Sequence, residues 1–462
     1  MENFEAYLSP FTWRYGTDTM RKLWSEGAKR RLWRQIWLGL AEVQATFDLV
    51  RPDQVEDLRK HVLEVDVVRS LEIESEIHHD LMAELRAYAE QCPTGGGVLH
   101  LGATSMDIED NADALRLRQG LDLVIADIRG LLLKFVEKIE AWAEHPIIGF
   151  THLQPAEPST LGYRLAVYAQ DLLFDWENLR RARAHVRGKG FKGAVGTGAS
   201  FGELLGVERI EEFEARLSAK LGLPFYPVTG QTYPRKQEYD IVCALAGMGA
   251  SIYKFALDLR LLQSPPLGEW SEPFGQKQVG SSAMPFKRNP IQAEKLDSLA
   301  RWLAQFPRLA WDNAAHSMLE RTLDDSANRR VLLPEAFLLS SELLAVTTRL
   351  VAGLQFDTAA LSKNLSTFAP FAGTERVLMA LGKAGADRQK MHERIRNYSM
   401  AAWKARESGD PHSLADDLAG DEEIAGYLSS QEILELMQAE RYVGNAPQRA
   451  LALANTIREV LA

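Results

Sequence analysis

IEDNADALRLRQGLDLVIADIRGLLLKFVEKIEAWAE, residues 108–144, is the longest uninterrupted helical pattern in the chain, and it decides the fold class. Apolar side chains recur along it at three- and four-residue spacing, and it contains no proline. At 1.5 Å per residue, such a helix would be roughly 55 Å long. Its apolar side chains lie on several faces, so one short bundle cannot cover them all. The stretch predicts a core of many helices, and we expect subunits of a homo-oligomer to share it.

Helical spacing also dominates the rest of the chain, and alternating strand patterns are scarce. The best strand candidate is the short run 224–229. The sequence therefore predicts an all-α fold with a long-helix bundle at its centre. We expect three helical domains, 1–104, 105–356 and 357–462. The other long helical patterns are 17–49, 160–187, 238–263, 290–311 and 334–354.

Charge and cysteine content point to a cytoplasmic protein that binds neither nucleic acid nor membranes. Lys and Arg total 53 and Asp and Glu total 63, so the net charge is −10, which repels both kinds of anionic partner. Only two cysteines are present, in no CxxC spacing, which argues against a disulfide framework and a cysteine zinc site. The longest uncharged apolar stretch, 241–253, is shorter than the roughly 20 residues of a membrane span. The first residues, MENFEAYLSPF, do not resemble a signal peptide.

The segment GSSAMPFKRNP, residues 280–290, is rich in hydrogen-bond donors and interrupted by glycine and proline. Its hydroxyls and the lysine that follows them suit the stabilisation of developing negative charge. On composition alone, a solvated surface loop with a basic tip is the simpler interpretation.

This segment closely resembles the GSSxMPxKxNP signature of the fumarase/aspartase superfamily, in the version found in adenylosuccinate lyases and carboxymuconate cycloisomerases. The resemblance implies that Ser281 is the catalytic base on a mobile loop, next to a substrate-binding Ser282. It also implies that Lys287 and Asn289 bind the carboxylates of a succinyl group, with Lys287 counted among the catalytic residues.

The segment GFTHLQPA, residues 149–156, lies between two long helical patterns. Taken alone, its histidine is an ordinary polar surface residue. It resembles the Thr-His segment of the same superfamily, which implies that Thr151 binds substrate and that His152 is the general acid. The resemblance also pairs His152 with Glu294, whose carboxylate would favour the proton-donor form of the imidazole.

The segment HLGATSMD, residues 100–107, precedes the longest helix. Ser105 or Asp107 could simply cap that helix. The family places a Thr-Ser pair here on a substrate carboxylate, which implies a binding role for Thr104 and Ser105. Both roles are compatible, because a helix N-terminus favours anions.

The segment ERTLDDSANRR, residues 320–330, is a mixed-charge run that ion pairs alone could explain. It resembles the nucleotide site of adenylosuccinate lyases, where arginine binds phosphate through two parallel hydrogen bonds. The chain departs from that family at His78 and Lys295, where relatives carry arginine. By the resemblance, Arg321, Ser326 and Arg330 hold the nucleotide, chiefly its phosphate, and Arg14 and Tyr15 form another phosphate contact. The resemblance also implies that His79, Asp80 and Gln231 bind substrate.

Together these motifs identify the chain as a member of the adenylosuccinate lyase family. Membership implies β-elimination of fumarate from a nucleotide, in a homotetramer whose active sites draw on three chains. It implies neither a metal nor an organic cofactor, and the adjacent His78 and His79 point roughly 100° apart on a helix, unlike a metal-binding pair. Two alternatives stay open: another superfamily enzyme, acting on argininosuccinate or carboxymuconate, and a non-catalytic helical homologue.

Overall fold

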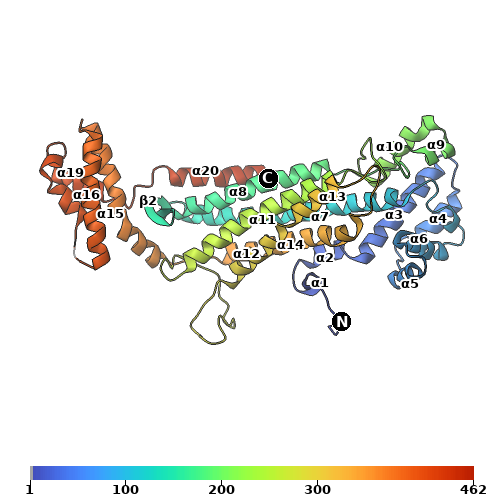
Figure 1. Ribbon diagram of the computed structural model, residues 1–462, viewed down its shortest axis with the longest axis horizontal. Helices are drawn as coiled ribbons and strands as arrows, with labels where there is room; N and C mark the ends of the chain where they lie inside the picture. Colours follow the sequence, from blue (N-terminus) through green and yellow to red (C-terminus); the bar gives the residue numbers. More distant parts are fainter. Residues whose placement is uncertain (1–3, 411) are drawn as a thin grey trace. The chain divides into compact units, whose positions relative to one another are not determined.

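The computed structural model describes residues 4–410 and 412–462, and its regular structure is almost entirely helical (Figure 1). The all-α fold class predicted from the sequence is confirmed. In chain order the elements are α1 (Pro10–Trp13), α2 (Asp18–Leu23), α3 (Glu26–Ala45), α4 (Pro52–His61), α5 (Val67–Ile77), α6 (Asp80–Gln91), η1 (Gly96–Val98), α7 (Ser105–Trp142), β1 (Pro146–Thr151), β2 (Gln154–Thr160), α8 (Leu161–His185), α9 (Ala199–Leu205), η2 (Val207–Arg209), α10 (Ile210–Leu221), α11 (Lys236–Gln263), β3 (Trp270–Ser271), α12 (Ile291–Leu303), α13 (Phe306–Ala315), α14 (Ser326–Gly353), β4 (Gln355–Phe356), α15 (Thr358–Lys383), α16 (Arg388–Ser408), α17 (Leu414–Ala419), α18 (Glu422–Ala425), α19 (Ser430–Met437) and α20 (Ala446–Leu461).

Contacts between residues divide the chain into two compact units, and each is described by itself. The predicted division into three domains stays a prediction. Unit 1 consists of Met1–Arg129, Phe174–Ile252 and Ser298–Val346, and unit 2 of Gly130–Leu173, Tyr253–Asp297 and Thr347–Ala462.

In unit 1, helices α3 to α6 gather with α9 and α10 (Figure 1), and α10 contacts both α3 and α9. Helix α3 begins where the Ser25 hydroxyl accepts a hydrogen bond from the amide of Ala28, and it buries an apolar face. A buried ion pair of 2.6 Å between Arg34 and Glu84 joins α3 to α6. Since removing one partner would leave an uncompensated buried charge, this pair fixes how the two helices meet.

The long helices of unit 1 pack closely where side chains are small. A Cβ added to Gly120 of α7 would lie 2.7 Å from the ring of Phe337 of α14, so only glycine permits this approach. The same ring stacks on Trp24 at 5.2 Å between centroids. These contacts form the bundle that the sequence predicts.

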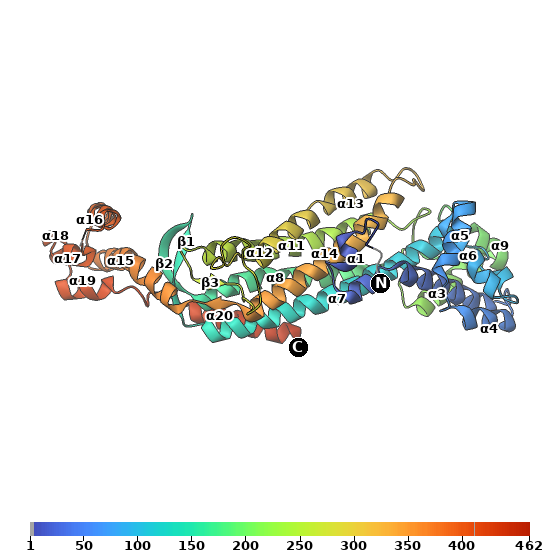
Figure 2. The ribbon, with the colours of Figure 1, turned by 90° about the horizontal axis from the view of Figure 1, so that it is seen from below.

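Unit 2 contains the antiparallel hairpin of β1 and β2 and the C-terminal helices. Helices α16 to α19 gather beside α15 (Figure 2), which contacts α16, α17 and α19. Their core is apolar and includes the fully buried Leu418, Ile424 and Ile433. The ring of Phe255 in α11 contacts the rings of Phe135 in α7 and Tyr168 in α8, each at 5.5 Å between centroids.

Five details of the elements differ from the sequence-based prediction. Run 224–229 is not a strand, since only Phe225 within it makes an isolated bridge, with Gly188. The β1–β2 hairpin is not predicted by the sequence, because its prolines argue against strands. The helical pattern 17–49 is interrupted before Ser25, which caps α3. The pattern 290–311 is interrupted before α13, which has a proline in its first turn. Helix α14 begins at Ser326 and continues through Pro334.

Helices α11 and α14 are long and apolar enough, by length and composition, to cross a membrane. The most apolar windows of these helices are 44% and 72% buried inside the molecule. Burial of this kind is what core helices of a packed bundle show.

Candidate functional site: a cavity at three helix N-termini

A cavity of about 420 Å³ in unit 1 brings together residues from four separate stretches of the chain. His78, one of the two departures from the family pattern, also lines it. The residues in its wall that the sequence predicted to bind substrate are His79, Asp80, Thr104, Ser105, Gln231, Arg321, Ser326 and Arg330.

Three helices begin in the wall of this cavity. Asp80 is the first residue of α6, Ser105 the first of α7 and Ser326 the first of α14. The first amides of a helix have no partner within it, and the helix dipole makes this end positive. Together with the guanidinium groups of Arg321 and Arg330, these ends create a cavity suited to an anionic ligand.

One ion pair crosses the cavity. Arg330 donates a 2.7 Å hydrogen bond from Nη2 to Oδ2 of Asp80. Burial alone would raise the pKa of Asp80, but the hydrogen bond and charge of Arg330 lower it below its ordinary value. The side chain of Arg330 remains 54% exposed, so its other donors are available to a ligand.

His79 caps α6 and faces the start of α7. Its Nδ1 accepts a hydrogen bond from the amide of Met82 at 3.4 Å. An imidazole that accepts at Nδ1 carries its proton on Nε2, and this Nε2 lies 3.5 Å from Oγ of Ser105. The ring therefore presents a donor to Ser105 or to a ligand that binds there.

Asp107 holds the segment that carries Thr104. Its carboxylate accepts hydrogen bonds from the amides of Thr104 (2.9 Å), Lys192 (3.1 Å) and Gly193 (3.2 Å), and it pairs with the ammonium of the buried Lys189. The prediction that Ser105 or Asp107 caps α7 is confirmed for Asp107. The same carboxylate ties the glycine-rich loop after α8 to this helix end.

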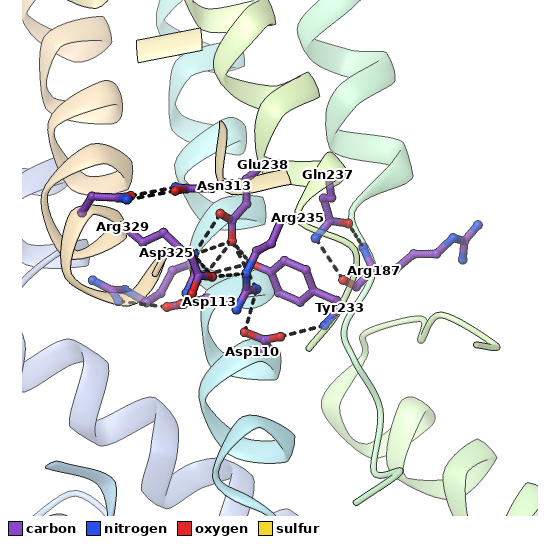
Figure 3. A network of polar contacts seen from close by, with 12 residues as sticks. Asp110, Asp113, Arg187, Tyr233, Arg235, Gln237, Glu238, Asn313, Asp325 and Arg329 are labelled. Carbon is purple, nitrogen blue, oxygen red and sulfur yellow. Dashed lines mark hydrogen bonds and ion pairs between the residues drawn. The ribbon is translucent and has the colours of Figure 1, made fainter. Parts of the chain in front are cut away.

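A buried network behind the cavity, which sequence reasoning missed, connects α7, α11 and α14 (Figure 3). Arg235 donates to Asp110 at 3.0 Å and to Asp325 at 2.6 Å. Arg329 donates to Glu238 at 2.9 Å. Asp325 also accepts from Arg321 at 3.0 Å, so the network fixes the segment that carries the three predicted nucleotide-binding residues of 320–330.

A smaller cavity of about 100 Å³ shares Asp80, Arg321, Ser326 and Arg330 with the first one. Glu109 lines both cavities, and the sequence reasoning did not single it out. Burial, followed by the charges of neighbouring carboxylates, raises its pKa to about 8. Its position four residues after Ser105 puts it on the same face of α7, but a glutamate at this spacing is too common in helices to indicate a role.

Arg14 and Tyr15 do not line this cavity. The guanidinium of Arg14 is exposed and lies over the rings of Trp13 and Tyr15, at 5.6 and 5.9 Å from their centroids. Tyr15 lines a separate, shallow pocket with Trp302. Their assignment to the phosphate therefore stays a prediction.

In unit 2, His152 lies at the tip of the hairpin. Thr151 pairs with Gln154, so His152 and Leu153 form the two-residue turn, with φ of 53° and 59°. Two consecutive positive φ values define the turn that Asn-Gly normally occupies. The exposed His152 is held there in a conformation that is unusual for its residue type and even more so for Leu153.

Loop 272–290 of unit 2 carries the signature segment (Figure 1). Oγ of Ser281 accepts hydrogen bonds from the amides of Met284 (3.1 Å) and Ala283 (3.4 Å). Ser282 and Lys287 are exposed, and the side-chain amide of Asn289 donates to the carbonyl of Gly280 at 3.0 Å. Two backbone donors on one hydroxyl oxygen would stabilise its alkoxide form.

The base of this loop is closed by two side chains. Glu272 accepts from the amides of Gln292 (3.2 Å) and Ala293 (2.6 Å) at the start of α12. Gln263 accepts from the amide of Glu272 (2.9 Å) and donates to the carbonyl of Arg288 (3.0 Å). Both ends of the loop are therefore anchored, whereas its tip is exposed.

Glu294 is exposed on the first turn of α12. Within residues 4–410 and 412–462 of a single chain, no hydrogen bond or ion pair joins His152, Ser281 and Glu294. The same described residues contain no group of three or more His, Cys, Asp or Glu side chains arranged for a metal ion.

Solved structures place the fold among the fumarate lyases and their relatives. A fumarate lyase from Mesorhizobium sp. BNC1 superposes with a TM-score of 0.85 at 24% identity, covering 97% of this chain and 99% of that one. A 3-carboxy-cis,cis-muconate lactonizing enzyme from Pseudomonas putida gives 0.84 at 23% identity, with the same coverage. At this identity the likeness defines the class of fold alone.

Sequence comparison defines the family. The lyase family matches residues 53–302, and the adenylosuccinate lyase C-terminal family matches residues 370–450. The adenylosuccinate lyase of Schistosoma mansoni is 38% identical over 99% of this chain and 96% of its own length. Those of Saccharomyces cerevisiae and Pyrococcus abyssi are 36% and 34% identical, over 97% and 98% of this chain and 94% and 98% of their own lengths. The chain belongs to the adenylosuccinate lyase family of lyases.

Proposed function

We propose that this chain catalyses the β-elimination of fumarate from adenylosuccinate, giving AMP, in purine biosynthesis. The second substrate is the succinylated aminoimidazole carboxamide ribotide, which gives the free carboxamide ribotide. The observation that carries the proposal is the cavity of unit 1, where three helix N-termini and the side chains of Arg321 and Arg330 favour a phosphorylated ligand.

In the proposed reaction, Ser281 removes the proton from the carbon next to a succinyl carboxylate, and His152 protonates the departing amine nitrogen. A serine is a weak base, but the amides of Ala283 and Met284 on its Oγ stabilise the alkoxide. Lys287 and Asn289, with Thr104 and Ser105 of the cavity, stabilise the carbanion and bind its carboxylates. Each proton transfer contributes roughly 10²–10⁴-fold in rate.

The proposed working form is a cytoplasmic homotetramer of three-domain subunits, with active sites shared between chains. In it, Glu294 of one chain pairs with His152 of another and keeps the imidazole in its proton-donor form. The proposed reaction uses no metal or organic cofactor, and the partners are small nucleotides rather than nucleic acid or membranes.

Incubation of the purified protein with adenylosuccinate tests the proposal. The absorbance of the purine band should change, and chromatography should identify AMP and fumarate as products. Argininosuccinate and carboxymuconate serve as control substrates, and AMP should inhibit only an enzyme that binds nucleotides. Turnover of a control substrate in place of adenylosuccinate, or a folded tetramer that turns over none of them, would contradict the proposal.

A further inference from the structure

Four carboxyl groups of unit 1, those of Asp80, Glu109, Asp110 and Asp113, are close enough to influence one another, and Asp80 and Glu109 line both cavities. Three of them have arginine partners in the described residues. Asp80 pairs with Arg330 at 2.7 Å, Asp113 with Arg329 at 3.1 Å, and Asp110 with Arg235 at 3.0 Å. Glu109 is the exception, because neither a hydrogen bond nor an ion pair within the described residues involves its side chain.

Glu109 therefore holds a proton in the empty cavity. Carboxylates at close range disfavour one another's ionisation, and a buried carboxyl without an ion-pair partner keeps its proton to a higher pH than an exposed one. Consistently, burial and then the charges of Asp80, Asp113 and Asp110 raise the pKa of Glu109 to about 8, opposed by Arg330. The other charged groups that line the smaller cavity are Glu26, Lys29, Arg116, Arg321 and Arg329.

Glu109 also lies at the end of the site that suits phosphate. It follows Ser105 by one helical turn on α7, and in the smaller cavity it lies in the same wall as Arg321, Ser326 and Arg330. An ionised carboxylate in this position would repel a phosphate dianion, whereas a neutral carboxyl donates a hydrogen bond to it.

We infer that Glu109 is a ligand-binding residue that donates a hydrogen bond from its neutral carboxyl to the phosphate group, so that binding of the phosphorylated ligand takes up a proton at alkaline pH. This inference rests on the proposed function for the identity of the ligand, a nucleoside monophosphate. The anion itself comes from the chemistry of the cavity.

The sign of the pH dependence follows from the raised pKa. At pH 7 the carboxyl is neutral in the empty cavity and binding needs no further proton. Above pH 8 the carboxyl of Glu109 is ionised, so binding of the phosphate dianion requires that Glu109 take up a proton. If only the neutral form binds, the Kd for AMP rises by about tenfold between pH 7 and pH 9, with uptake of about one proton per site at pH 9. The phosphate of AMP, with a second pKa near 6, stays dianionic over this range.

Isothermal titration calorimetry of AMP into the full-length protein tests this, at pH 7, 8 and 9 and in two buffers of different ionisation enthalpy. The unmodified protein should show the loss of affinity and the proton uptake. Glu109→Gln keeps a donor that cannot ionise, so its Kd should be the same at the three pH values and its proton uptake absent. Glu72→Gln is the matched control, because it removes an exposed carboxylate of α5 that lines neither cavity and should behave like the unmodified protein.

Three results would overturn the inference. The first is binding of AMP by the unmodified protein without proton uptake at pH 9, and the second is proton uptake that persists in Glu109→Gln. The third is binding of AMP by Glu109→Gln that is more than tenfold weaker at pH 7, which would mean that the ionised carboxylate contacts the ligand. The first measurement does not depend on how a variant folds. Inorganic phosphate, which is already a dianion at pH 9, is the second probe and separates the two proposals: proton uptake on binding phosphate at pH 9, without binding of AMP, would contradict the proposed function and leave the role of Glu109 standing.

Discussion

Arg330 illustrates how a single residue connects the sequence to the site. Sequence resemblance assigned it to the phosphate of a nucleotide, and the structure places it in a cavity with seven other predicted binding residues. Asp80 holds its guanidinium by one of the available donors and leaves the rest exposed. The residue is thus oriented before a ligand arrives, which reduces the entropy lost on binding.

Replacing Arg330 by glutamine should weaken the binding of AMP by roughly 10- to 100-fold, since a hydrogen bond to a charged group contributes about 1.5–3 kcal/mol. Calorimetry at pH 7 measures the change. Arg308→Gln is the control, because Arg308 pairs with Asp312 on the exposed face of α13 and should leave the Kd unchanged. Equal affinity of Arg330→Gln and the unmodified protein would remove Arg330 from the site.

Residues were predictable where they lie in a recognisable motif and not where their role depends on neighbours distant in sequence. The cavity confirms that His79, Ser105 and Arg330 lie together, although their contacts with substrate stay predictions. Glu109 was missed because a single glutamate in a helix is ordinary, and only the crowding by Asp80 and the other acids makes it unusual.

At the scale of elements, α7, α11 and α14 are joined by buried charge (Figure 3). Arg329 contacts both Glu238 and Asp113, and it immediately precedes Arg330 in α14. The network holds the first turns of α14 in place, which explains why the helix begins well before Pro334, the residue at which the sequence predicts its start.

Removing the charge of Glu238 should therefore destabilise unit 1. Glu238→Gln leaves the buried Arg329 without its main counter-ion, which typically lowers the free energy of unfolding by about 3–5 kcal/mol. Thermal or urea unfolding measures the loss. Glu90→Gln, which breaks an exposed pair with Arg69, should change it by less than about 1 kcal/mol. A Glu238 variant as stable as the Glu90 variant would show that the network contributes specificity rather than stability.

Periodicity predicted the long helices because each buries one or more continuous faces, and this signal is local. The hairpin was not predictable in the same way, since Pro146, Pro155 and Pro158 weaken any strand pattern. Its strands form because their backbone groups hydrogen-bond to each other and because the hairpin packs against α15, a helix about 200 residues later in the sequence. The positive φ values of His152 and Leu153 follow from that pairing and have no local sequence signal.

At the scale of the whole molecule, the predicted catalytic residues belong to unit 2 and the cavity belongs to unit 1. The proposed assembly builds each active site from several chains, so a defect in one chain can be complemented by another. A mixture of His152→Ala and Ser281→Ala subunits, dissociated and reassembled together, should regain activity that neither variant has alone. A mixed oligomer as inactive as its parents would contradict shared active sites.

The most direct test of the account is the rate of fumarate release from adenylosuccinate by Ser281→Ala, measured with its Kd for AMP. The proposed mechanism assigns proton removal to the loop of unit 2 and nucleotide binding to the cavity of unit 1. It predicts that turnover falls by at least about 100-fold, with the Kd for AMP unchanged. Undiminished turnover would contradict the role of Ser281, and with it the mechanism proposed for this chain.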